Sequence, residues 1–126
     1  LAGSARFYAA ILVPLGYAKK AGPNGVAFEL PARPDRLAGL GAVYVTRPYD
    51  GREATVGNGS MVALAAETHA LVRAIHAAGV EAGGADEGAP GFRAEYSAHF
   101  YVGYLRDPVG NKIAIYCANP AEGGRP

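Results

Sequence analysis

The side chains most able to bind a metal or attack a substrate are few in this sequence: three histidines and one cysteine. His69 and His76 stand seven residues apart on one stripe of a predicted helix, which is typical of solvent-facing residues. His99 begins a predicted strand and Cys117 ends its partner, and we expect both on the buried side of that pair. These four residues predict neither a nucleophile nor a metal site.

Acid–base chemistry without a metal would depend on other groups. Glu95 and Tyr104 can serve as a general base or acid. Glu95 lies with Arg93 and Tyr96 in the Gly-rich segment 83–98, which we expect to be a long loop, with room for one short strand, that closes over a cleft. The residue types alone do not specify a reaction.

A predicted β-hairpin positions most of these groups. Residues 99–105 and 112–117 are rich in aromatic and β-branched side chains, and the turn sequence Asp-Pro-Val-Gly-Asn (107–111) joins them. We expect Arg106 to pair with Lys112, which sets the register of the two strands.

This register divides the hairpin into two faces. We expect one face to carry Phe100, Val102, Tyr104, Ala114 and Tyr116. We expect the other to carry Tyr101, Gly103, Leu105, Ile113, Ile115 and Cys117. Because both faces are apolar, packed protein should cover one of them, and a ligand or partner should cover the other.

The rest of the chain predicts two helices and four further strands. The first helix covers residues 1–13 and stops before Pro14, and it begins either with Ser4 as N-cap or earlier, near the start of the chain. The second begins after the N-cap Thr68 and ends at the C-cap Gly79. The predicted strands are 16–20, 26–30, 41–46 and 60–66, with a loop at 31–40 and a connection at 49–58. The second half therefore repeats the first, which lacks a leading strand.

Composition excludes several classes of function. The chain has 126 residues, of which half are hydrophobic, as expected for one globular domain. Its net charge of +1 does not favour nucleic acid or a membrane surface as a partner, and no apolar run is long enough to span a bilayer. The single cysteine excludes an internal disulfide, which fits a reducing, cytoplasmic location. The chain starts at Leu1 without methionine, so we expect a fragment.

Several segments of the sequence are similar to those of one known family. They are SARFY (4–8) with LVPLGY (12–17), GNGSMVALAA (57–66), IHAAG (75–79), EGAPG (87–91) and YLRDPVGNKI (104–113). Together they resemble the vicinal oxygen chelate superfamily, in its branch of small glyoxalase/bleomycin-resistance/dioxygenase-like proteins. The resemblance covers nearly the whole chain, and the hairpin is its most specific part.

The resemblance implies an α+β fold of two βαβββ modules whose curved sheets enclose a small-molecule cleft. It divides the single domain 1–126 into a first module (1–50), a connection (51–59), a second module (60–119) and a tail (120–126). The leading strand of the first module should precede Leu1. Proteins of this fold commonly dimerise and sometimes exchange modules, so we expect a homodimer.

Enzymes of this superfamily hold a divalent metal through His, Gln or Glu side chains in the cleft. The resemblance puts Met61 at the fifth-strand ligand position and Ala114 at the last-strand position, and the strand around Tyr44 offers no ligand. A thioether and a methyl group do not hold such a metal. We therefore expect no metal and no cofactor.

Three functions stay open at this stage. The first is a metal-free protein that binds a small, partly aromatic or apolar molecule, such as a drug, through Met61, Phe100, Val102, Tyr104, Ala114 and Tyr116. The second is a lyase, isomerase or dioxygenase, related to lactoylglutathione lyase and extradiol dioxygenases, with a non-standard metal site or none. The third is a dimerisation or interaction module. Near-neutral charge argues against cationic bleomycin itself as the ligand.

Overall fold

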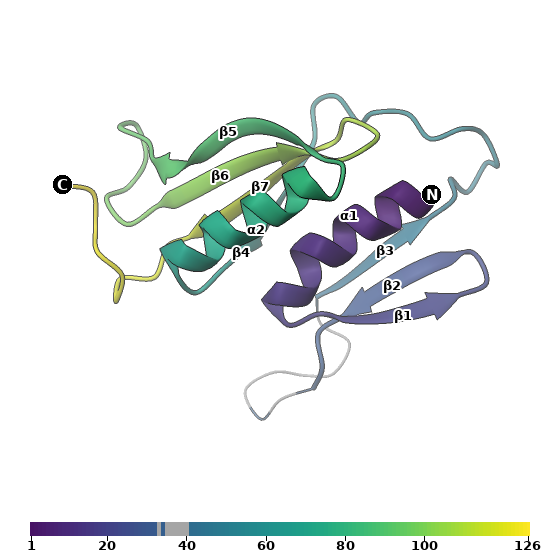
Figure 1. Cartoon of the computed structure of the whole chain (residues 1–126), viewed down its shortest axis with the longest axis horizontal. Coiled ribbons are helices and arrows are strands. Elements are labelled where there is room, and N and C mark those ends of the chain that lie inside the picture. The colour runs from purple at the N-terminus through teal and green to yellow at the C-terminus, as the bar shows by residue number, and fades with distance from the viewer. Residues whose placement is uncertain (33, 35–40) are drawn as a thin grey trace.

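The computed structural model describes residues 1–32, 34 and 41–126 (Figure 1). The helices are α1 (Ala2–Leu12), the short 3₁₀ helix η1 (Val13–Leu15) and α2 (His69–Glu81). The strands are β1 (Ala18–Gly22), β2 (Gly25–Glu29), β3 (Ala42–Thr46), β4 (Met61–Ala65), β5 (Ala85–Phe92), β6 (Tyr101–Arg106) and β7 (Lys112–Cys117). Most of the predicted loop 31–40, namely residues 33 and 35–40, lies outside the described residues.

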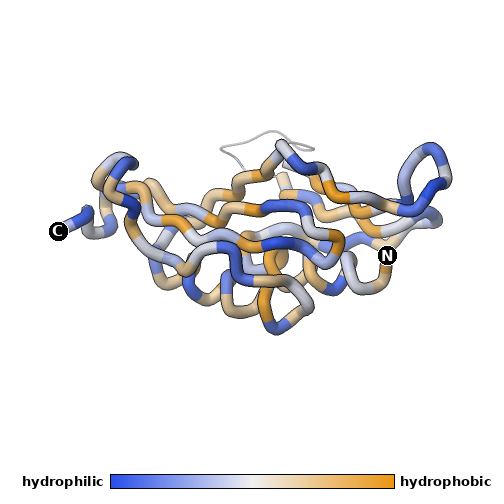
Figure 2. The backbone as a smooth tube through the Cα atoms, turned by 90° about the horizontal axis from the view of Figure 1, so that it is seen from above, coloured by the Kyte–Doolittle hydropathy of each residue, from blue (hydrophilic) through white to orange (hydrophobic). Residues whose placement is uncertain are grey.

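The strands form two sheets, one in each half of the chain. The first has the order β1-β2-β3, and the second has the order β4-β7-β6-β5, in which β4 runs parallel to β7. Figure 2 shows the strands of both sheets on one side of the molecule and the two helices on the other. In the second sheet β4 pairs with the outer edge of β7. Within the described residues, no strand pairs with the outer edge of β3 in the same way. The predicted α+β fold of two modules, the first without its leading strand, is confirmed.

Helix α1 forms because apolar residues recur along one of its faces, where Phe7, Ile11 and Leu12 are buried. Its α-helical part ends at Leu12, and Pro14 lies in the 3₁₀ turn that follows, as the loss of a backbone N–H at proline requires. The prediction of Ser4 as N-cap was wrong. The helix begins earlier, with Leu1 at the N-cap position and no side-chain cap.

Helix α2 begins as predicted, because Thr68 Oγ1 accepts a hydrogen bond from the N–H of Leu71 at 3.0 Å. It does not end at Gly79. The helix continues to Glu81, and the glycine with a left-handed backbone is Gly83, at a φ of 103°. Gly79 is buried inside the helix, where the lack of a Cβ lets α2 approach its neighbours closely.

The segment 83–98 is not mainly a loop. Its residues 85–92 form β5, which pairs with β6 through a register that shifts on both sides of Gly88. Glycine and Pro90, which suggest turns in the sequence, occupy a bulged strand at the edge of the sheet, where a missing N–H is tolerated. An added Cβ at Gly88 would lie 3.0 Å from the Tyr104 ring, so the irregularity also makes room for that ring.

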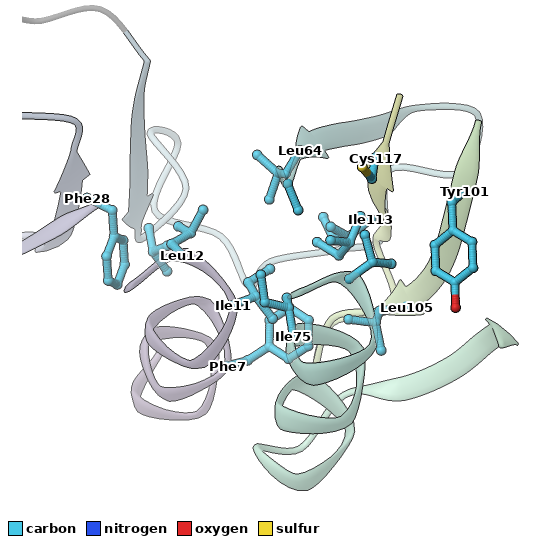
Figure 3. Close-up of a cluster of buried hydrophobic side chains, with 14 residues drawn as sticks. Phe7, Ile11, Leu12, Phe28, Leu64, Ile75, Tyr101, Leu105, Ile113 and Cys117 are labelled. Carbon is cyan, nitrogen blue, oxygen red and sulfur yellow. The ribbon is translucent and has the colours of Figure 1, made fainter. Parts of the chain in front are cut away.

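One hydrophobic core joins the two modules. It lies between the helices and both sheets, and Figure 3 shows α1 and α2 side by side beneath the strands. Its largest fully buried members are Phe7, Ile11, Leu12, Phe28, Ile75, Leu105, Ile113 and Ile115. Residues of both modules share this cluster, so neither module could keep its inner face dry alone.

The register of the hairpin is the predicted one. Arg106 pairs with Lys112, and the alternate residues Tyr101, Leu105, Ile113, Ile115 and Cys117 belong to the core. Strands β1 to β4 lie within one or two residues of their predicted positions, and residues 49–58 contain no helix or strand, as predicted. In the described part of the chain, neither helix is long and apolar enough to cross a membrane.

Replacing Gly79 with alanine should destabilise the protein, although alanine normally favours a helix over glycine by about 1 kcal/mol. The new Cβ would lie 2.7 Å from Leu105 Cδ1 and 3.1 Å from Ile11 Cγ2, inside a packed core. We expect the free energy of unfolding to fall by about 1–3 kcal/mol, measured by urea denaturation.

Gly3→Ala is the matched control, because Gly3 lies in α1 with nothing within 4 Å of an added Cβ. That substitution should leave the free energy of unfolding unchanged or raise it by up to ~1 kcal/mol. Equal effects of the two substitutions would contradict the role given to Gly79.

Candidate functional site

The face of the second sheet that points away from the helices carries a row of aromatic side chains. We call it the aromatic face; its residues are Phe100, Val102, Tyr104, Ala114 and Tyr116. Val102 and Ala114 are buried at its base, whereas the three aromatic residues are partly exposed. The structure thus brings together five of the six predicted binding residues on one surface.

The rings on this face contact one another. Phe100 and Tyr116 are stacked, with centroids 5.2 Å apart and an angle of 22° between their planes. Tyr96, from the connection after β5, meets Phe100 edge to face at 5.4 Å. The Tyr104 hydroxyl donates to the Tyr96 hydroxyl at 3.4 Å. These rings form a flat apolar surface on which a planar molecule can stack.

Two cations lie against the Tyr104 ring. Lys112 Nζ is 4.8 Å from its centroid, and Arg93 Cζ is 5.7 Å from the same centroid. The Arg93 guanidinium also donates to the carbonyls of Ala89, at 2.8 Å, and Phe92, at 3.3 Å. Lys112 was missed by sequence reasoning, although strand alternation places it on the face of Ala114 and could have found it.

The C-terminal tail holds the connection between β5 and β6 in place. Arg125 Nη1 donates to the carbonyl oxygens of Tyr96, at 2.8 Å, and Arg93, at 3.1 Å. The Arg125 backbone N–H also donates to the Ala98 carbonyl at 2.6 Å. Tyr96 is therefore fixed beside Phe100 by residues far away in the sequence.

Tyr104 is not suited to act as a base at neutral pH. Burial and its hydrogen bond to Tyr96 raise the pKa of the Tyr104 hydroxyl, and these effects outweigh the nearby Arg93. The phenol therefore stays protonated at neutral pH and cannot act as a base there. Glu95, the other predicted acid–base group, is exposed on the connection and makes no hydrogen bond or ion pair.

The helix histidines are not solvent-facing, contrary to the prediction. His76 is buried, and its Nε2 lies 3.0 Å from Asp86 Oδ1 and 3.1 Å from the Tyr104 carbonyl oxygen. His69 stacks on Tyr101 at 4.3 Å, and its Nε2 is buried without a hydrogen-bond partner. The reason is β5, which is longer than the one short strand expected within segment 83–98 and covers this side of α2.

The remaining two candidates have simple positions. Cys117 is fully buried in the core, as predicted. The prediction of His99 on the buried side of the hairpin was wrong, because β6 begins only at Tyr101: His99 precedes the strand, is exposed, and lies beside Gly124 of the C-terminal tail. Neither side chain reaches the aromatic face.

A cavity of about 650 Å³ lies elsewhere, at the junction of the modules. Its walls come from α1, from consecutive residues of β3, from Val62 and Leu64 of β4, and from the turn of the β6–β7 hairpin. Consecutive residues of β3 point to opposite faces, so the cavity runs along the free edge of that strand. It occupies the position that β4 holds beside β7 in the second sheet. None of the six predicted binding residues lines it.

No protein-family model and no curated protein matches the sequence. Solved structures do. A glyoxalase/bleomycin resistance protein from Albidiferax ferrireducens T118 is 36% identical, over 93% of this chain and 88% of that one, with a TM-score of 0.76. The chain belongs to the glyoxalase/bleomycin resistance protein family.

Two more distant structures share the fold. A glyoxalase-related enzyme from Fulvimarina pelagi is 20% identical, covering 93% of this chain and 79% of that one, with a TM-score of 0.61. A glyoxalase/bleomycin resistance protein/dioxygenase family enzyme from Burkholderia phytofirmans PsJN is 16% identical, covering 93% and 89%, with a TM-score of 0.65.

The metal that the family implies does not fit the residues present. Met61 is half-exposed at the start of β4, level with Lys112, and Ala114 is buried opposite Tyr104. Neither offers a nitrogen or oxygen donor from its side chain. Nowhere in the described residues do three His, Cys, Asp or Glu side chains gather in a group that could hold a metal ion. We derive no reaction step through a metal at this site.

Asp107 begins the turn that most resembles the family. Its Oδ1 accepts the backbone N–H groups of Val109, Gly110 and Asn111, each at 2.9 Å. Its Oδ2 accepts from the Asn111 side chain at 3.1 Å and from the Tyr8 hydroxyl at 2.6 Å. Burial alone would raise the pKa of Asp107, but these hydrogen bonds outweigh burial and hold that pKa below its ordinary value.

Asp107→Asn should lower the free energy of unfolding at pH 7 by about 2–3 kcal/mol, because charge-assisted hydrogen bonds are lost. The folded pKa of Asp107 is depressed, so its stabilisation is present above the unfolded pKa of about 3.9 and disappears as pH falls through the folded pKa. Urea denaturation at pH 7 and pH 2.5 should therefore show a difference between variant and parent that shrinks in acid.

Tyr8→Phe serves as the control, since it removes one donor and leaves the other four. It should lower the free energy of unfolding by about 1 kcal/mol. A difference between Asp107→Asn and the parent that is the same at both pH values would refute the role of the carboxylate charge.

Proposed function

We propose that this family member binds a small, partly aromatic or apolar molecule on the aromatic face, without a metal. The observation that carries the proposal is the stacked, partly exposed pair Phe100 and Tyr116. Aromatic pairs of this kind contribute roughly 0.5–1.5 kcal/mol beyond the area that they bury, so a third planar ring gains by adding to the stack.

The half-exposed Met61 supports the same function. It extends the apolar surface on β4, at the position where enzymatic relatives present a metal ligand. A thioether side chain is flexible and polarizable, and it adapts to flat ligands. Val102 and Ala114 are buried beneath the aromatic side chains and support them from below.

The cavity at the module junction is a less suitable binding site for such a molecule. It follows the unpaired edge of β3, where backbone N–H and C=O groups favour a strand over a small apolar ligand. Two unpaired strand edges, those of β3 and β4, border it, with Tyr44 and Val62 more than half exposed. We propose that the protein is a cytoplasmic homodimer, in which a partner covers this region.

A thermal-shift screen tests the binding function. The screen contains aromatic compounds with one ring, two fused rings and three fused rings. Each ring system is tested as a carboxylate, a neutral amide and an aminomethyl cation. A ligand that binds only the folded protein stabilises it by about 2.7 kcal/mol at 100 times its Kd. For a chain of this size we expect the Tm to rise by roughly 8 °C. Tyr116→Ala should remove the shift, because it breaks the stack with Phe100.

Tyr49→Ala is the matched control, because Tyr49 is fully exposed in the connection between the modules. It should keep the ligand-induced shift of the parent. The function is refuted if no compound in the panel raises the Tm. It is also refuted if Tyr116→Ala and the parent respond equally. Elemental analysis of the purified protein should show no stoichiometric zinc, nickel, iron or manganese.

A further inference from the structure

Lys112 is a cation with no anionic partner. In the described part of the chain its ammonium makes no hydrogen bond and no ion pair, and its one close contact is the Tyr104 ring, 4.8 Å away. Lys112 is nevertheless partly buried. The ring attracts the cation, but it satisfies none of the three ammonium donors, which therefore stay available to an acceptor on a ligand.

Two charged residues close to Lys112 form an ion pair with each other. Arg106 stands opposite Lys112 in the strand pair. It forms an ion pair with Glu87 at 3.0 Å and donates a hydrogen bond to the Gly110 carbonyl. The Arg106 guanidinium lowers the pKa of Glu87, which fits a closed ion pair. The charge of Lys112 also helps to lower the pKa of Glu87, but in the described part of the chain Lys112 forms no ion pair with that carboxylate. The Glu87 carboxylate is therefore already bound by Arg106.

Arg93 adds a second positive charge at the same ring. Its guanidinium is bound to two neutral carbonyl oxygens and to no carboxylate among the described residues. Glu95 is the acid that acts on Tyr104 from the connection, but it is exposed. Two cations, Lys112 and Arg93, thus lie against the Tyr104 ring, and neither forms an ion pair with a carboxylate in the described part of the chain.

The spacing of side chains along β7 suits an elongated molecule that contacts Lys112 at one end and the aromatic stack at the other. Lys112, Ala114 and Tyr116 point to the same side, and alternate residues of a strand lie about 6.6 Å apart. The lysine and the stack of Phe100 and Tyr116 are therefore separated by roughly 13 Å, with Ala114 between them along the strand. An extended small molecule of that length can contact both ends.

We propose that the molecule bound on the aromatic face is an aromatic carboxylate. Its carboxylate accepts hydrogen bonds from the Lys112 ammonium, and its ring extends along the partly exposed aromatic side chains toward the stack of Phe100 and Tyr116. This inference rests on the proposed function and adds the charge of the ligand. A cationic aromatic molecule, which a bare aromatic surface would attract, is repelled here because Lys112 and Arg93 already occupy the Tyr104 ring.

The test compares three probes that differ only in charge: 2-naphthoate, 2-naphthamide and 2-naphthylmethylamine. Isothermal titration calorimetry gives their Kd values for the parent at 20 mM and 500 mM NaCl. We expect 2-naphthoate to bind at least about tenfold more tightly than the amide at low salt. The advantage should shrink at high salt because the contact is partly solvent-exposed.

Lys112→Gln tests the residue itself. It should weaken binding of 2-naphthoate about tenfold and leave binding of 2-naphthamide within about twofold of the parent. Lys112→Arg, which keeps the charge, should retain most of the affinity for the carboxylate. Lys20→Gln is the control, because Lys20 is an exposed lysine of β1 in the other sheet, and it should change neither Kd. Circular dichroism melting verifies that each variant is folded.

The outcomes separate this inference from the function on which it rests. If neutral or cationic compounds are the ligands that raise the Tm, or if Lys112→Gln affects acid and amide equally, the aromatic carboxylate is refuted while the binding function stands. If no probe and no compound of the panel binds, both the aromatic carboxylate and the proposed binding function are refuted. Preferential binding of 2-naphthoate that Lys112→Gln removes supports the inference.

Discussion

The register of β6 against β7 is the constraint on which the rest of the structure depends. One carboxylate, that of Asp107, accepts hydrogen bonds from three successive backbone N–H groups of the turn and from Tyr8 of α1. Strand side chains alternate with a period of two, so a slip of one residue would exchange the core face and the aromatic face completely. The same acid ties the turn to the first module, which couples the register to the packing of α1.

This register produces two apolar faces, one covered by helices and the other partly exposed. Helices cover the inner face, because α1 and α2 bury Ile113, Ile115 and Leu105 in a core shared by both modules. The outer face has no helix and keeps partly exposed rings. In a family whose enzymes hold a metal there, this chain presents Met61 and Ala114. In the function that we propose, stacking on the Phe100 and Tyr116 pair and the Lys112 ammonium would take the place of metal coordination.

The expectations that failed did so for one shared reason. Gly79 and Gly88 suggest a helix end and a loop, because glycine is common at both. In the structure they are instead points of close approach, to Leu105 and Ile11 in one case and to Tyr104 in the other. A local sequence pattern cannot distinguish a glycine that turns the chain from one that admits a neighbour. Because segment 83–98 was expected to be mainly a loop, His76 was wrongly placed in solvent, although β5 helps to bury it.

The sequence by itself determined the hairpin, its register, its two faces and the family, because strand alternation and turn chemistry act over a few neighbouring residues. It also determined that Met61 and Ala114 cannot bind a metal. Only the tertiary structure decided that β5 covers α2, that a cavity follows the edge of β3, and that Lys112 stands beside Tyr104 without an acceptor. These features join residues distant in the chain, and their energies depend on burial and charge that arise only when the modules pack together.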